Sequence, residues 1–125
     1  SESAYCFGDY VYRLGDYAWY EENSGKKTHP VGEKQANNWG IHDMHGNVFE
    51  WCQDWYGYEY YAECLKQRVV KNPQGPSSYS GRVVRGGSWN FNGRRVRSAC
   101  RSHYSPDDRD RLSGFRLASG HKAGR

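Results

Sequence analysis

The sequence predicts a single folded domain of short β-strands and long irregular loops, with few helices. Its 125 residues are enough for one domain with a modest core. Aliphatic side chains are scarce, but 11 Tyr, 5 Trp and 4 Phe residues can supply the apolar area of that core. Helical spacing of apolar residues is weak, whereas aromatic and β-branched runs bounded by turn-forming residues recur.

Four segments have the composition of strands, and they follow one another after an irregular start. Residues 1–35 mix aromatic residues with turn formers and show no sustained helical spacing. The first strand is predicted at 48–56, within a stretch rich in Gly, Asn and Trp. The last third of the chain contains the other three, at 82–89, 97–104 and 114–119, which polar linkers connect.

The predicted strand at 97–104 alternates between two sets of side chains. Odd-numbered residues fall on one face and even-numbered residues on the other, which places His103 opposite Tyr104. Neither face is strongly apolar. We therefore expect a sheet with one surface turned to solvent or a ligand, and with arginine stems packed on aromatic rings at the other.

Charge is distributed unevenly along the chain. Residues 1–81 carry seven basic and eleven acidic side chains, whereas residues 82–125 carry eleven basic and three acidic ones. Such asymmetry can indicate nucleic-acid binding. The arginines are spaced singly, however, and no Lys/Arg run of the phosphate-binding kind occurs, so we expect no nucleic-acid partner. No apolar run approaches the roughly 18 residues of a membrane span, so we expect none.

The four cysteines are Cys6, Cys52, Cys64 and Cys100, and no two form a C-x-x-C motif. This spacing argues against a zinc knuckle or a thioredoxin-like site. A Cys6–Cys64 or Cys52–Cys64 disulfide would suit a secreted protein. Four free and mostly buried thiols are an equally good interpretation.

Two other groups of reactive side chains lack the partners that catalysis or metal binding requires. His42 and His45 are three residues apart, but glycines flank them and no further ligand pattern follows, which favours structural histidines. Cys100 and Ser102 share a predicted strand face on which no base accompanies them. We expect no nucleophilic catalysis from that strand.

Three interpretations remain open for the acidic residues near the first predicted strand. Glu50 and Asp54 could form an acid–base pair, which would need a cleft and different pKa values. Asn47, the carbonyl of Val48 and Glu50 could instead supply oxygen ligands to a structural Ca²⁺ ion. The interpretation that we favour is a Glu50 hydrogen-bonded within a loop-rich core, with calcium second.

Six motifs occur in one order along the chain: GNVFEW (46–51), DWYG (54–57), RVVRGGSW (82–89), RSACR (97–101), PDDR (106–109) and GFRLA (114–118). Together they resemble the formylglycine-generating-enzyme-like, or sulfatase-modifying-factor, domain over about residues 5–118. The resemblance implies an α+β, C-type-lectin-like fold that is loop-rich, with short antiparallel strands and few helices. It predicts one such domain at 1–118, followed by a flexible tail at 119–125.

The oxidase members of this family hold copper and activate oxygen with a pair of cysteines. The first of these follows shortly after the GGS-aromatic motif, a place that Phe91 occupies here. No cysteine occurs between Trp89 and Ala99. The resemblance therefore predicts a protein that is not an enzyme, has no catalytic residues and requires no cofactor. The structural Ca²⁺ ion at Asn47 and Glu50 is a separate prediction, made from those residues.

Residues 82–118 resemble more specifically the variable region of proteins diversified by diversity-generating retroelements. In that family a fixed framework alternates with positions that adenine-specific mutagenesis of asparagine codons changes. The matching positions in this chain are Asn90, Phe91, Asn92, Arg95, Cys100, Ser102, His103, Tyr104, Asp108, Asp110, Arg111 and Leu112. Codons that keep a final pyrimidine can encode every residue found at these positions.

The resemblance thus predicts a non-catalytic protein that recognises a protein or other macromolecular ligand through a hypervariable surface. We expect that ligand on a cell or virus surface, and the protein itself to be surface-exposed, secreted or virion-associated. Aromatic anchors and an arginine would lead binding, namely Phe91, Tyr104, His103 and Arg111. Smaller and acidic side chains would shape specificity, namely Cys100, Ser102, Asp108 and Asp110. The alternatives are a divergent or fragmentary oxidase and an accessory structural domain.

Overall fold

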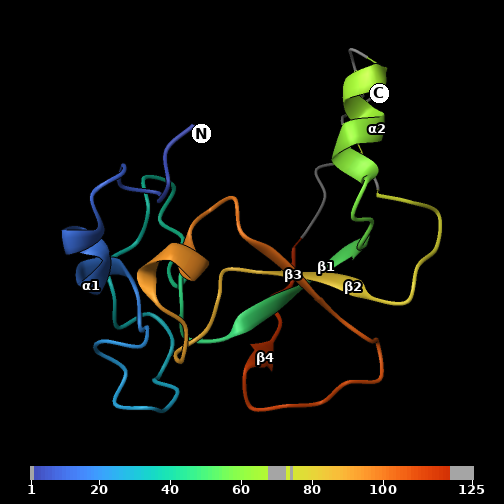
Figure 1. The fold of residues 1–125 in the computed structure, drawn as a ribbon. Helices are drawn as coiled ribbons and strands as arrows, with labels where there is room; N and C mark the ends of the chain where they lie inside the picture. The colour runs from blue at the N-terminus through green and yellow to red at the C-terminus, as the bar shows by residue number, and fades with distance from the viewer. Residues whose placement is uncertain (1, 68–72, 74, 119–125) are drawn as a thin grey trace, which may run out of the picture.

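The computed structural model describes residues 2–67, 73 and 75–118, so the predicted tail at 119–125 lies outside the described residues. The elements in chain order are η1 (Val11–Arg13), α1 (Leu14–Tyr17), β1 (Phe49–Trp55), α2 (Tyr60–Lys66), β2 (Arg82–Arg85), η2 (Gly93–Val96), β3 (Arg101–Tyr104) and β4 (Ser113–Gly114) (Figure 1). Long irregular segments join them, which confirms the loop-rich α+β prediction. In the described part of the chain, no helix has the length and apolarity needed to cross a membrane.

The four strands form one sheet in the order β3-β2-β1-β4. β1 pairs with β2, and β2 with β3, in antiparallel fashion, with a bulge in β1 between Trp51 and Trp55. β4 pairs with β1 in parallel, which differs from the predicted antiparallel sheet. The reason is the path of the chain: residues 105–112 loop back below the sheet, so that β4 enters beside the start of β1 (Figure 1).

Three strands are shorter than the sequence predicts, for identifiable reasons. β2 ends at Arg85 because Gly86 and Gly87 follow with φ of 91° and 72°, which breaks the extended backbone. β3 begins only at Arg101 because η2 and a turn occupy the residues before it. β4 has two residues instead of the six predicted at 114–119. The strand predicted at 48–56 is confirmed as β1.

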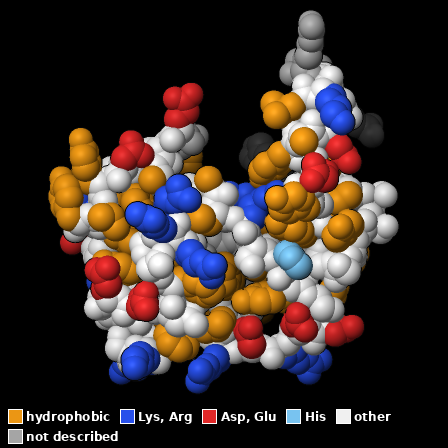
Figure 2. Space-filling model, viewed as in Figure 1, with side chains coloured by type: hydrophobic (Ala, Val, Ile, Leu, Met, Phe, Trp, Pro, Cys, Tyr) orange, Lys and Arg blue, Asp and Glu red, His pale blue; other side chains and the backbone are white. Residues whose placement is uncertain are grey.

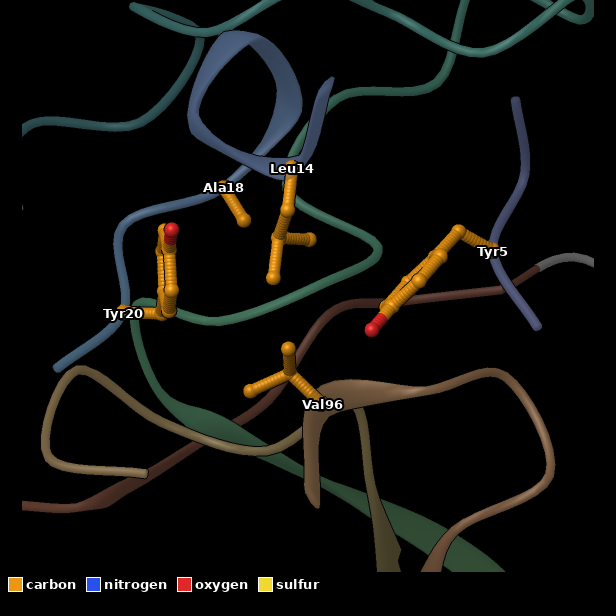
Figure 3. Close-up of a cluster of buried hydrophobic side chains, with 5 residues drawn as sticks. All are labelled: Tyr5, Leu14, Ala18, Tyr20 and Val96. Atoms are coloured by element: carbon orange, nitrogen blue, oxygen red, sulfur yellow. The ribbon is translucent and has the colours of Figure 1, made fainter. Parts of the chain in front are cut away.

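A core cluster of five buried side chains joins α1 to η2. It consists of Tyr5, Leu14, Ala18, Tyr20 and Val96 (Figure 3). Gly87 permits this packing, because a Cβ atom there would lie 2.5 Å from Cγ1 of Val96. The second glycine of the RVVRGGSW motif therefore has a structural role, as expected of a glycine at a close approach.

Three distant segments meet at Gly46 and Asn47. The Asn47 amide donates to the Trp19 carbonyl at 2.7 Å, and the Asn47 carbonyl accepts from the Trp89 amide at 2.8 Å. Its side chain accepts from the His29 amide and donates to the His29 carbonyl, both at 3.0 Å. The GN pair thus fastens two N-terminal loops and the GGSW segment to the start of β1.

Candidate ligand-binding surface

The twelve predicted variable residues lie around η2, on β3 and in the loop at 105–112 (Figure 1). None of the twelve is buried. Several framework residues that precede or interrupt the first group are buried, namely Gly87, Ser88, Trp89, Gly93 and Val96, whereas the framework residue Arg94 is exposed. The predicted variable residues are therefore all accessible to a ligand, whereas the framework contains both buried and exposed side chains.

One face of the sheet carries a cluster of four aromatic rings, which we call the aromatic face: Phe49, Trp51, Phe91 and Tyr104. Phe49 is buried, and the ring of Phe91 meets it edge-on at a centroid distance of 5.2 Å. The Tyr104 ring meets Phe49 at 5.9 Å and Trp51 at 6.1 Å. Burial, with smaller contributions from nearby acidic charges, raises the pKa of Tyr104, so its hydroxyl remains a neutral donor at pH 7.

His103 lies on the opposite face, as the predicted alternation requires. Its ring stacks on Tyr56 at 4.4 Å. The neighbouring guanidinium of Arg101 lies over Tyr56 at 4.9 Å and over Tyr61 of α2 at 4.0 Å. The structure therefore does not bring all the predicted binding residues together, because His103 and Tyr104 point to different sides of the same strand.

Two arginines of the predicted set lie over aromatic rings. Arg95 lies 5.3 Å from the ring centre of Phe91, and Arg111 lies 5.4 Å from that of Trp89. The indole N–H of Trp89 also donates to the Arg111 carbonyl at 3.4 Å. These contacts orient two exposed guanidinium groups by cation–π attraction, and that of Arg95 lies over a ring of the aromatic face.

The acidic residues of the loop at 105–112 organise its backbone. Asp108 accepts a hydrogen bond from the Ser105 amide at 2.8 Å, and Asp110 accepts one from the Leu112 amide at 2.8 Å. Acidic and basic side chains lie next to one another along the lower edge of Figure 2, where Figure 1 draws this loop. The loop therefore presents a polar, mixed-charge rim.

The calcium prediction concerns Asn47 and Glu50, and both already have protein partners. The side-chain amide of Asn47 forms two hydrogen bonds with the backbone of His29. Both carboxylate oxygens of Glu50 accept hydrogen bonds from Arg116. Sequence reasoning missed Asp43, whose Oδ1 is buried without a partner in the described residues. Asp43 and Glu50 line a cavity of about 480 Å³. A calcium ion there would use Asp43 rather than the Asn47 side chain and would compete with Arg116, so calcium binding stays a prediction.

The resemblance places the first catalytic cysteine of the oxidase members at residue 91 of this chain. Phe91 stands there, with its ring packed between Phe49 and the core cluster. All four cysteines of the chain are free thiols and half-buried. Burial raises the pKa of Cys6 and of Cys52, which favours the protonated thiol. Phe91 has no thiolate to offer, so position 91 does not fit a copper ion that needs a sulfur ligand there.

Comparison with known proteins assigns the chain to a family. Residues 5–120 match the Sulfatase-modifying factor enzyme 1-like domain. The formylglycine-generating enzyme of Streptomyces coelicolor is 38% identical over 101 residues, which cover 78% of this chain and 31% of that protein. A protein named serine/threonine-protein kinase pkn1 from Chlamydia caviae is 42% identical over 95 residues, which cover 76% of this chain and 15% of that protein.

Two solved structures are similar to this chain in fold and in sequence. Treponema denticola variable protein 1 superposes with a TM-score of 0.69 at 38% identity, covering 83% of this chain and 36% of that one. PvdO from Pseudomonas aeruginosa superposes with a TM-score of 0.64 at 29% identity, covering 80% of this chain and 38% of that one. The chain thus spans less than two fifths of each of these relatives. It belongs to the family of the Sulfatase-modifying factor enzyme 1-like domain.

Proposed function

We propose that this domain is a ligand-binding scaffold that recognises a protein or other macromolecule on the surface of a cell or virus. Its binding residues are the twelve predicted variable positions, which a retroelement diversifies. The likeness to Treponema denticola variable protein 1 supports the scaffold role. Phe91 at the place of the oxidase cysteine supports a function other than formylglycine formation.

The observation that carries the proposal is that none of the twelve predicted variable residues is buried. Side chains that hold the core, such as Ser88 and Val96, are fully buried, whereas all twelve predicted variable residues are exposed or half-buried. Substitutions at exposed sites usually change stability by less than about 0.5 kcal/mol. A surface of this kind can therefore change its chemistry while the domain continues to fold.

The composition of this surface suits recognition of a macromolecule. Phe91 and Tyr104 supply aromatic anchors, and Arg95 and Arg111 supply cations that aromatic rings orient. Aromatic and arginine side chains dominate the binding energy at protein interfaces. Phe91 and Tyr104 would contact the ligand first, whereas His103 would be reached only by a ligand that extends round β3.

Deep sequencing of this gene and its flanks from a natural population tests the diversification. The proposal predicts changes confined to the twelve codons, together with an adenine-rich template copy nearby. Variation spread evenly along residues 82–118, without such a copy, would contradict it. The domain would then be a fixed accessory module.

A pair of codon libraries tests the physical part of the proposal separately. One library randomises Arg95, His103, Asp110 and Arg111, which are exposed, and the other randomises Ser88, Gly93 and Val96, which are buried. Protease resistance then counts the members that fold. We expect most members of the first library and few of the second to resist cleavage. Phe91 needs its own measurement, because it packs on Phe49 and its replacement by Ala should cost about 1–2 kcal/mol.

A further inference from the structure

The turn at residues 37–41 holds a tryptophan side chain in solvent. Oδ1 of Asn37 accepts from the amides of Trp39 at 2.9 Å and Ile41 at 3.0 Å. Two backbone bonds at 2.9 Å, from Asn37 to the Ile41 carbonyl and from Gly40 to the Asn37 carbonyl, close the turn. The indole of Trp39 is nevertheless 85% exposed. Four hydrogen bonds thus order a turn whose largest side chain contributes nothing to the core and is accessible to a ligand.

Trp39 borders a cavity of about 580 Å³ beside the sheet. Met44, Cys52 and Gly86 also line it, and Met44 is 42% exposed. A Cβ atom on Gly86 would find only the Met44 carbonyl within 4 Å, at 3.4 Å, so the backbone there is open. The volume lies within the range of about 300–1,000 Å³ typical of small-molecule sites, and such sites are mainly apolar with a few polar groups.

Arg85 supplies a cation in the wall of this cavity. It is half-buried on β2, and its Nη2 donates to the Ser98 carbonyl. This bond uses one of the five N–H donors of a guanidinium group. Within the described residues Arg85 forms no ion pair, since the salt bridge present joins Arg116 to Glu50. Glu50 also lines this cavity, but both of its carboxylate oxygens accept from Arg116. Arg85 is therefore suited to receive a carboxylate from a ligand.

We propose that this cavity binds a small molecule that combines a flat aromatic ring with a carboxylate. The ring stacks on Trp39, and the carboxylate pairs with Arg85. Trp51 also lines this cavity, but the other three residues of the aromatic face do not. In the sheet Arg85 pairs with Glu50 and Arg101, whereas its neighbour Val84 pairs with Trp51. Because successive side chains of a strand alternate, those of Arg85 and Val84 point to opposite sides of the sheet.

Titration of the ¹⁵N-labelled chain with indole-3-acetate tests the proposal. The indole N–H signals of the five tryptophans are followed by NMR, and the signal lost in Trp39→Phe identifies that of Trp39. We expect the Trp39 signal to move and to saturate at millimolar or lower ligand. Trp39→Ala should weaken binding about tenfold, as should Arg85→Gln, and Arg85→Lys should retain part of the affinity.

The controls separate this site from non-specific binding. Tyr12→Ala removes another exposed aromatic ring, which is 79% accessible and does not line the cavity, and should leave the dissociation constant unchanged. The neutral analogue indole-3-acetamide should bind about tenfold more weakly, because it cannot pair with Arg85. A Trp39 signal that does not move, equal binding of the amide, or equal losses in Tyr12→Ala and Trp39→Ala would each overturn the proposal. Melting curves of each variant show that it is folded.

Discussion

Arg116 holds Glu50 with two hydrogen bonds, although 66 positions separate the two residues along the chain. Its Nε donates to Oε2 at 2.6 Å and its Nη2 donates to Oε1, and Nη2 also reaches the Asp43 carbonyl at 3.2 Å. The hydrogen bond to Glu50 raises the pKa of Arg116. One guanidinium thus fastens the GFRLA segment to β1 and to the loop that carries Asp43.

Removing this guanidinium should destabilise the domain measurably. Both side chains are only partly exposed, so Arg116→Ala leaves Glu50 without its charged partner, and we expect a loss of about 1–2 kcal/mol in the free energy of unfolding. Arg116→Lys should lower the free energy of unfolding by a smaller amount, because lysine keeps the charge but cannot form the bidentate contact. Urea denaturation measures both. Arg109→Ala, at an exposed arginine, is the control, and an equal loss there would contradict the prediction.

Gly46→Ala should prevent folding or nearly so. Gly46 has φ of 73°, and an added Cβ would lie 2.1 Å from the Trp19 carbonyl oxygen, so backbone must move. Gly40 has nearly the same φ, 74°, but nothing lies within 4 Å of its Cβ position. Gly40→Ala should therefore cost only about 1 kcal/mol, the strain of the backbone conformation. Thermal melting compares the two, and similar effects would refute the role assigned to the Trp19 contact.

The contrast between Gly46 and Gly40 shows what the sequence could and could not predict. Both glycines lie in a stretch rich in Gly and Asn, with aromatic or polar residues beside them. Neither residue spacing nor conformational propensity reveals which glycine packs against the backbone of a distant segment. β1 was predictable because its aromatic and β-branched run is local. The parallel pairing of β4 depends on the path of the loop at 105–112, which local patterns do not encode.

The candidate surface was predictable in a similarly divided way. Alternation along β3 correctly placed His103 and Tyr104 on opposite faces. The sequence did not reveal that Phe91 packs on Phe49, because that contact joins residues far apart in the chain. It also missed Asp43 and Trp39, whose positions beside cavities follow from tertiary packing and not from any motif.

Stability should fall as the pH drops below about 6.5, in part through His45. Its ring is buried and fully bonded: Nδ1 donates to the Val96 carbonyl at 2.8 Å, and Nε2 accepts from the Cys6 amide at 3.0 Å. Burial lowers the pKa of His45 below the ordinary value of 6.5. As the pH falls, the unfolded chain therefore takes up a proton on His45 before the folded chain does. The contribution of His45 to stability is complete above pH 6.5 and is lost as the pH falls through the lower pKa of the folded state.

The measurement for His45 is the slope of unfolding free energy against pH, between about pH 5 and pH 7.5. His45→Gln should flatten that slope. His42→Gln, at an exposed histidine, should leave it unchanged. An identical slope in wild type and His45→Gln would show that other groups account for the pH dependence.

A calcium site, if formed, should depend on Asp43 and Glu50. Calcium in excess over its Kd raises the melting temperature, because the ion binds only the folded chain. We expect Asp43→Asn to abolish that increase, since it removes the carboxylate with the unpartnered Oδ1. Differential scanning fluorimetry in calcium and in EGTA makes the comparison. Equal melting temperatures of wild type in the two buffers would mean that Arg116 alone neutralises this site.

Copper provides the decisive comparison with the oxidase members of the family. Cu(I) prefers soft thiolate ligands, and Phe91 replaces the first of the two that the resemblance implies. We therefore expect no stoichiometric Cu(I) binding in competition with a chromophoric chelator, and no oxidation of cysteine in a sulfatase-derived peptide. Phe91→Cys supplies one thiol beside the buried Phe49 ring, and a single thiol should bind Cu(I) more weakly than a pair. Tight one-to-one binding by the unmodified chain would mean that other cysteines assemble a site, and the binding-scaffold proposal would give way to an oxidase.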